Sequence, residues 1–294
     1  MIRIATRGSK LALTQAGQVA EMLGGAELVE VSSDGEVGDK SRFVRGVERA
    51  LLAGEAEVGV HSAKDLPGEM AAGLEIAAVP AREDAADVWI GPGASLADVP
   101  EGARVGSASL RRRAQLLAAR PDLRVEELHG NVDTRLRKLA GGELNAIVLA
   151  AAGLRRLGRE AEIGFAIPAA AMVPAAGQGA LALQVRAEDA AASAALAPLN
   201  DLAAMRELTA ERTVVALLQA TCASPLGVHA RVAGERIEVE AFVGLPDGSE
   251  WLRDRIEGEA AEPSLAGARL AERLLSAGGR DLLDRAEQVG GEAA

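Results

Sequence analysis

Short apolar runs alternate with helical patterns through the first half of the chain, and this alternation most constrains the fold. Ile2 to Ala5 predicts a strand, and Ser9 to Leu23 predicts a helix that ends at Gly24-Gly25. The pattern continues to Ala146–Ala150, an apolar run typical of a buried central strand. Strands that alternate with helices predict sheets with crossover helices, which is the α/β class.

Two segments interrupt this alternation and predict crossings between two α/β domains. The charged stretch 81–87 separates the first strands from a pattern that restarts at Arg104. The turn-rich stretch 173–179 precedes the apolar run 180–185, which predicts a strand that returns to the first domain.

The last third of the chain has a different pattern. Alternation with a period of two begins at Val228, and amphipathic helices are predicted from about Ser264 and Arg280. This part predicts a small α+β domain. We therefore expect domain 1 at residues 1–82 and 176–198, domain 2 at 83–175 and domain 3 at 199–294.

Composition argues against several kinds of function. A net charge of −11 and the absence of tyrosine argue against wholesale binding of nucleic acid, and the charge also disfavours an anionic membrane. A single cysteine excludes an internal disulfide and fits a reducing compartment. No apolar signal segment is present, and Pro168 and Pro174 interrupt the longest uncharged run, 163–185. We therefore expect a soluble, cytoplasmic protein.

The segment His61-Ser62-Ala63-Lys64-Asp65-Leu66-Pro67 is the first candidate site. The apolar run 58–60 predicts a buried strand, which Pro67 prevents from continuing. A lysine and an aspartate thus stand at the carboxyl end of a strand, where open α/β sheets bind their ligands. The aspartate could stabilise positive charge or relay a proton beside the fixed cation. A solvated surface ion pair is the alternative interpretation.

Three predicted strand-to-helix junctions combine arginine with capping residues, among them Ser9 and Ser109. Arginine in a first turn opposes the helix dipole, which is reasonable if a bound anion compensates it. The stretch 104–138 carries nine Lys or Arg against four Asp or Glu. Arginine favours bidentate pairing with carboxylates or phosphates, so the sequence predicts a small polyanionic ligand between two domains. The junctions are residues 5–9, 106–113 and 130–135.

The lone cysteine, Cys222, lies between a predicted helix and the bend Pro225-Leu226-Gly227. Single cysteines are often apolar fillers of a core, but a position in a turn favours an accessible sulfur. No histidine and asparagine set typical of thiol hydrolases accompanies it. Covalent attachment of a group to Cys222 is the better functional hypothesis.

Taken together, seven motifs in order along essentially the whole chain resemble the porphobilinogen deaminase family, also called hydroxymethylbilane synthases. Each motif alone is modest, but their order and spacing make the resemblance specific. The motifs are Ala5-Thr6-Arg7-Gly8-Ser9, the segment 61–67, Gly106-x-x-Ser109-Leu110-Arg111-Arg112, Gly130-Asn131-Val132-x-Thr134-Arg135, Ala152-Gly153-Leu154-x-Arg156-Leu157-Gly158, Pro174-Ala175-x-Gly177-Gln178-Gly179 and Cys222-x-x-Pro225-Leu226-Gly227.

The resemblance implies two domains of the periplasmic-binding-protein type, joined by hinge strands, and a third domain with a cofactor-bearing cysteine. Cys222 would bind a dipyrromethane through a thioether. A transferase of tetrapyrrole and haem biosynthesis is implied, which condenses four porphobilinogen units head-to-tail on this primer. It would release ammonia and, by hydrolysis, hydroxymethylbilane. A monomer with a small-molecule substrate is implied, without nucleic-acid, membrane or metal partners.

Roles for individual residues also follow from the resemblance. Asp65 would protonate the leaving amine, stabilise the azafulvene cation and accept the proton lost when aromaticity returns. Arg7, Arg156 and Phe43 would contact the substrate, with Lys40 as a possible lid cation. The acetate and propionate groups of the cofactor would be held by Lys64, Arg7, Ser9, Ser107, Ser109, Arg111, Arg112 and Arg135.

The sequence departs from the family pattern at three places. His129 replaces the usual arginine before Gly-Asn-Val, the segment Ser33–Arg42 is short, and Thr221 replaces a glycine before the cysteine. These departures keep two alternatives open. One is a paralogue that binds pyrroles but releases little tetrapyrrole, and the other is a plain two-domain anion-binding protein.

Overall fold

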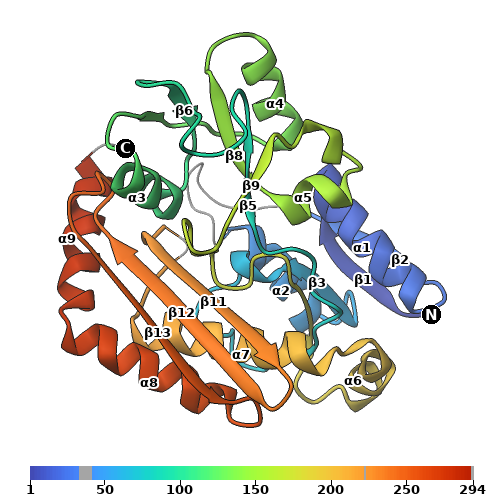
Figure 1. The fold of residues 1–294 in the computed structure, drawn as a ribbon. Coiled ribbons are helices and arrows are strands. Elements are labelled where there is room, and N and C mark those ends of the chain that lie inside the picture. The colour runs from blue at the N-terminus through green and yellow to red at the C-terminus, as the bar shows by residue number, and fades with distance from the viewer. Residues whose placement is uncertain (33–41, 222, 293–294) are drawn as a thin grey trace.

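The computed structural model describes residues 1–32, 42–221 and 223–292, which form two α/β units and a smaller α+β unit (Figure 1). This confirms the expected fold class. Among the described residues, none of the helices has the length and apolar character needed to cross a membrane.

The first sheet has the strand order β2-β1-β3-β10-β4. Strand β1 is parallel to β2 and β3, whereas β10 is antiparallel to β3 and β4. Helices α1 and α6 pack on one face of the sheet and α2 packs on the other. The elements are β1 (Arg3–Arg7), α1 (Lys10–Met22), β2 (Glu27–Val31), α2 (Arg42–Leu52), β3 (Val58–Ser62), η1 (Ala63–Asp65), β4 (Leu74–Ala78), β10 (Leu181–Arg186), α6 (Ala190–Leu196) and η3 (Ala197–Leu199).

The second sheet repeats this arrangement with the order β7-β6-β8-β5-β9. Strand β8 occupies the centre, as its apolar sequence predicts, and β5 is antiparallel to it. Strands β5 and β9 were not predicted, because β5 begins inside the charged stretch taken as a crossing. The elements are β5 (Asp87–Ile90), β6 (Arg104–Gly106), α3 (Leu110–Ala119), β7 (Arg124–Glu126), α4 (Val132–Ala140), β8 (Ala146–Ala150), α5 (Ala151–Arg156), η2 (Glu160–Glu162) and β9 (Phe165–Ile167).

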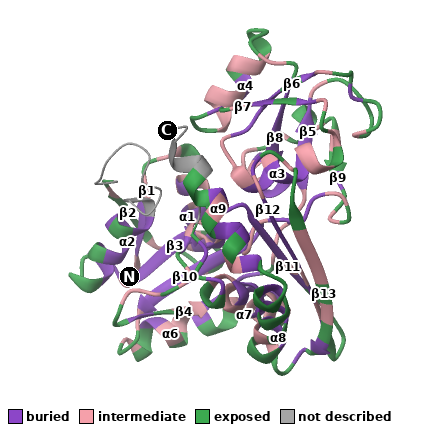
Figure 2. Cartoon of the chain, turned by 90° about the vertical axis from the view of Figure 1, so that its left-hand side faces the viewer, coloured by how far each residue is buried: buried purple, intermediate pink, exposed green. Residues whose placement is uncertain are grey.

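The C-terminal unit is an antiparallel sheet of order β11-β12-β13, covered by α7, α8 and α9. Its alternating side chains pack on those helices, as the period of two in the sequence predicts. Figure 2 shows that burial is concentrated in the strands, most clearly in β3 and β10. The elements are α7 (Leu202–Leu217), β11 (Leu226–Ala233), β12 (Arg236–Gly244), β13 (Trp251–Glu259), α8 (Pro263–Ser276) and α9 (Gly279–Glu292).

Two chain segments cross between the α/β sheets, and a buried ion pair ties both to α7. Arg82 of the first crossing donates to the Glu211 carboxylate at 2.7 and 3.1 Å. The same carboxylate accepts from the backbone N–H groups of Gly177, in the second crossing, and of Ala230 in β11. Burial alone would raise the pKa of Glu211, but Arg82 and His229 hold it well below its usual range. One side chain thus joins all three units. The exact residue boundaries of the domains stay a prediction.

Candidate active site

Lys64 and Asp65 lie in the single turn η1 that follows the buried strand β3. The turn is held at its start by the Ala63 N–H, which donates to the Ala180 carbonyl, directly before β10. Asp65 Oδ2 lies 3.7 Å from Arg7 Nη1, and the Asp65 side chain is 38% exposed. The carboxylate therefore sits beside a cation and remains open to a ligand.

Lys64 is partly buried and lies near charged groups of the second α/β unit. Its Nζ donates to Gln178 Oε1 at 3.4 Å. Burial lowers the pKa of Lys64 to about 8, and the positive charges of Arg112 and Arg111 add to this, while Asp65 and Asp87 oppose it. The structure thus places a cation of reduced pKa between the two α/β domains.

His61, four residues before Asp65, belongs to the core. Its Nε2 lies 2.8 Å from Gln184 Oε1, and Gln184 in turn donates to Glu48. Burial lowers the pKa of His61 to about 4, so the ring is neutral at neutral pH. His61 therefore supports the strand that carries the site.

The three predicted junctions are helix N-termini. Ser9 and Ser109 are the N-caps of α1 and α3, as predicted, and Asn131 is the N-cap of α4. Ser107 accepts from the Ser109 N–H at 3.2 Å, so this serine orders the loop before α3. The side chains of Ser9 and Ser109 thus cap helices, and that of Ser107 accepts a hydrogen bond within its own loop.

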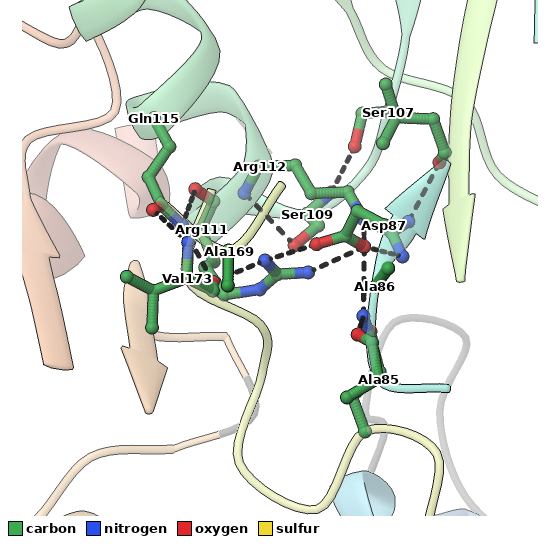
Figure 3. A network of polar contacts seen from close by, with 12 residues as sticks. Ala85, Ala86, Asp87, Ser107, Ser109, Arg111, Arg112, Gln115, Ala169 and Val173 are labelled. Carbon is green, nitrogen blue, oxygen red and sulfur yellow. Dashed lines mark hydrogen bonds and ion pairs between the residues drawn. The ribbon is translucent and has the colours of Figure 1, made fainter. Parts of the chain in front are cut away.

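Arg111 and Arg112 are buried, and both pair with one internal carboxylate, that of Asp87 (Figure 3). Sequence reasoning assigned these arginines to an external anion, and it did not identify their protein partner. Burial alone would raise the pKa of Asp87, but the two guanidinium groups hold it well below its usual range. Whether both arginines contact a ligand stays a prediction.

The other predicted cations lie in different surroundings. Burial lowers the pKa of Arg135 to about 10, with Arg112 adding to the effect, and Arg135 Nε is buried without a hydrogen-bond partner among the described residues. Arg156 donates to the Gly179 carbonyl at 2.7 Å and so contacts the second crossing. The His129 ring is 74% exposed and lies 2.9 Å from Glu127 Oε2. Among these three residues, Arg135 is thus the best candidate to bind an anionic group of a ligand.

A cavity of about 90 Å³ lies beside this cationic set. Lys64, Ser109, Arg111 and Arg212 supply its polar lining, together with Thr221 and Ser224 from the third unit. Among the described residues, none of those that line it has an acidic side chain. A larger cavity of about 580 Å³, beside Arg82 and Glu207, contains none of the predicted site residues and mixes charges of both signs.

The side chains of three predicted site residues are not among those that the structure describes. Cys222 and Lys40 lie outside the described residues, and the Phe43 side chain lies outside the described side chains, although its backbone belongs to α2.

Two family models match the chain. "Porphobilinogen deaminase, dipyromethane cofactor binding domain" matches residues 2–194, and "Porphobilinogen deaminase, C-terminal domain" matches residues 205–276. Porphobilinogen deaminase of Thiobacillus denitrificans is 43% identical, over 96% of this chain and 98% of that protein. The chain belongs to the porphobilinogen deaminase family.

One further relative and one solved structure are also similar to the chain. Porphobilinogen deaminase of Syntrophus aciditrophicus is 42% identical, over 97% of this chain and 99% of that protein. Among solved structures, the periplasmic aliphatic sulphonate binding protein SsuA of Escherichia coli is 13% identical, with a TM-score of 0.41 and coverage of 73% of this chain and 69% of that chain.

Members of the porphobilinogen deaminase family carry a dipyrromethane, and the donor set fits such a group. A dipyrromethane with acetate and propionate side chains requires cations and hydrogen-bond donors without competing carboxylates. The acid-free cavity lining and the unpartnered Nε of Arg135 meet this requirement. The cavity of about 90 Å³ is smaller than the roughly 300–1,000 Å³ of pockets for drug-sized ligands, so it could enclose only part of the group.

Sequence reasoning missed three residues of this region. Asp87 was included in a charged crossing, Gln178 was noted only as part of a turn motif, and Arg212 was assigned to a helix without a role. Arg212 lines the cavity and donates to the Gly68 carbonyl at 3.1 Å. A carboxylate directly before the apolar run Val88–Ile90 is the one signal that could have identified Asp87.

Proposed function

We propose that this chain condenses four porphobilinogen molecules head-to-tail onto a dipyrromethane primer attached to Cys222, releasing ammonia and hydroxymethylbilane. Family membership supports the reaction, and the acid-free cavity supports a carboxylate-rich ligand. Thr221, directly before Cys222, and Ser224, two residues after it, contribute to that cavity. A place in tetrapyrrole synthesis follows from this product.

The observation that carries the proposal is the half-exposed Asp65 carboxylate, 3.7 Å from Arg7 and adjacent to Lys64. Loss of ammonia from porphobilinogen leaves a cationic azafulvene, which a fixed carboxylate stabilises. The same side chain, in its acid form, can protonate the departing amine, and as the carboxylate it can later accept the proton that the attacking pyrrole loses when its aromaticity returns. A carboxylate buried in ion pairs, such as Asp87, could not perform these exchanges.

Lys64, Arg111 and Ser109 face the space where the acidic side chains of the pyrroles would lie. Lys64 and the arginine forks would hold carboxylates, and Arg135 would gain a partner for its buried Nε. When bound, the primer supplies the pyrrole carbon that forms the first new bond. The monomeric state, the cytoplasmic location and the substrate roles of Arg7, Arg156 and Phe43 stay predictions.

Intact-mass measurement of the purified protein tests this function. We expect a mass above the 30.2 kDa chain by one dipyrromethane, and no such adduct on Cys222→Ser. Incubation with porphobilinogen should then give the absorbance of released tetrapyrrole. An unmodified mass that persists after incubation with porphobilinogen contradicts the proposal.

The paralogue alternative is tested in the same experiment. An adduct that is retained without any tetrapyrrole release would favour a pyrrole-binding protein over the enzyme. The exposure of His129 and its contact with Glu127 motivate this control, because that position adds no buried cation to the site.

A further inference from the structure

Asp87 is the first residue of β5, at the point where the first crossing enters the second sheet. Its side chain is fully buried. Figure 3 shows it facing the guanidinium groups of Arg111 and Arg112, which come from the first turn of α3. A strand start and a helix start thus meet at one carboxylate.

The contacts fix both arginines tightly. Arg111 donates through Nη1 to Asp87 Oδ2 at 2.6 Å and through Nη2 to Oδ1 at 3.1 Å. Arg112 donates through Nε to Oδ1 at 2.8 Å. One backbone carbonyl accepts a further hydrogen bond from each arginine, since Arg111 also donates to Val173 at 2.8 Å and Arg112 to Val148 at 2.9 Å. Each fork therefore has a single orientation.

The Gln178 side chain links Asp87 to Lys64 in the turn η1. Its Nε2 donates to Asp87 Oδ1 at 3.1 Å and to the Ala85 carbonyl at 2.7 Å, while its Oε1 accepts from Lys64. The flanking backbone is packed closely against η1, because a Cβ at Gly177 would lie 2.8 Å from the Ala63 carbonyl carbon. Gly177 also has a φ of +71°, which glycine adopts without strain.

The net charge of the cluster formed by Asp87, Arg111 and Arg112 indicates what it can bind. Two guanidinium groups and one carboxylate leave one net positive charge in a buried place, where an uncompensated charge is costly. One external carboxylate compensates it. We propose that Asp87 is a positioning residue, which aligns Arg111 and Arg112 to hold one carboxylate of the bound pyrrole chain. Gln178 fixes the position of this cluster of Asp87 and two arginines relative to Lys64. The inference rests on the proposed function.

The cluster of Asp87, Arg111 and Arg112 also affects the charge of Lys64. Lys64 faces Asp65 of its own turn, Asp87 of β5, Arg111 and Arg112 of α3, and Arg212 of α7 across the cavity. Removing the negative charge of Asp87 disfavours the ammonium form of Lys64. Carboxylate binding that needs the ammonium form is then lost at a lower pH than in the unaltered protein.

The test compares holoenzyme of Asp87→Asn with Asp84→Asn. Asp84 lies in the same crossing but pairs with the half-exposed Arg155 at 3.0 Å, so it is a matched control. Adduct occupancy is measured by intact mass, and kcat and KM for porphobilinogen are measured from pH 6 to 10, per loaded molecule. We expect kcat/KM to fall about 10- to 100-fold in Asp87→Asn, mainly through KM, with its alkaline limb moved to lower pH.

Gln178→Met keeps the test decisive if Asp87→Asn does not fold, because it removes the three side-chain hydrogen bonds of Gln178 and keeps the ion pairs of Asp87 with both arginines. We expect the same alkaline shift with a loss of about 2- to 10-fold. Values equal to those of Asp84→Asn, or a loss without any change in the pH profile, overturn the positioning role. Unaltered protein without adduct or turnover instead contradicts the proposed function.

Discussion

The two α/β domains share one sheet arrangement, but their key carboxylates lie in opposite environments. Asp65, after β3, is 38% exposed and has a cation at 3.7 Å, whereas Asp87, at the start of β5, is fully buried between two arginines. An open carboxylate can exchange protons with a ligand, and a buried, paired one can only orient its partners. The same residue type is thus suited to chemistry in one domain and to alignment in the other.

The largest expected effect is on turnover by Asp65→Asn. Amide replacement removes both the proton exchange and the negative charge, so kcat should fall by about 10²- to 10⁴-fold. The free energy of unfolding should change by less than about 1 kcal/mol, because the pair with Arg7 is partly exposed. Turnover assays and urea denaturation of the loaded protein check this. Turnover at the unaltered rate would show that the carboxylate is not the reactive group.

Asp87→Asn, unlike Asp65→Asn, should strongly lower the free energy of unfolding. Removing one partner of a buried ion pair leaves charge uncompensated, so the free energy of unfolding should fall by about 3–5 kcal/mol. Urea denaturation beside Asp65→Asn and Asp84→Asn measures the difference. If Asp87→Asn and Asp65→Asn are equally stable, the contrast between a buried and an open carboxylate fails.

Acid should weaken the two domains in separate pH ranges. Because the folded pKa of His61 is about 4, below its ordinary 6.5, the unfolded chain binds a proton first, and stability falls as pH drops from 6.5 to 4. That loss amounts to about 3 kcal/mol. The pKa of Asp87 is also depressed, so its stabilisation is present above the ordinary aspartate value and is lost only at still lower pH.

Unfolding free energies measured from about pH 7 down to about pH 2 separate these contributions. His61→Gln cannot titrate and should flatten the upper part of the acid profile while leaving the lower part intact. An unchanged slope between pH 6.5 and 4 would contradict the assignment of that range to His61.

The smallest expected effect is that of His129→Arg. The ring is 74% exposed and contacts Glu127, so an arginine there gains an exposed pair of small energy. We expect kcat/KM to change by less than about threefold. Steady-state assays beside His129→Ala check this, and a tenfold gain would mean that position 129 reaches the bound pyrrole chain.

Much of the fold could be predicted because strand and helix periodicity are local. The α/β pattern, the return of the strand after residue 179 and the α+β unit were predicted, as were the caps Ser9 and Ser109. Strands β5 and β9 were missed, since short strands next to charged or turn-rich segments have no distinctive period.

The sequence by itself determined the family and the supply of cations, and it predicted Asp65 as the reactive residue, because ordered motifs and local charge are written along the chain. Only the tertiary structure decided how those cations are used. The partners of Arg111 and Arg112 are distant in sequence, and Gln178 reaches Asp87 and Lys64 from a third segment. Burial changes the energy of a charge through its neighbours in space, and those neighbours follow from packing alone.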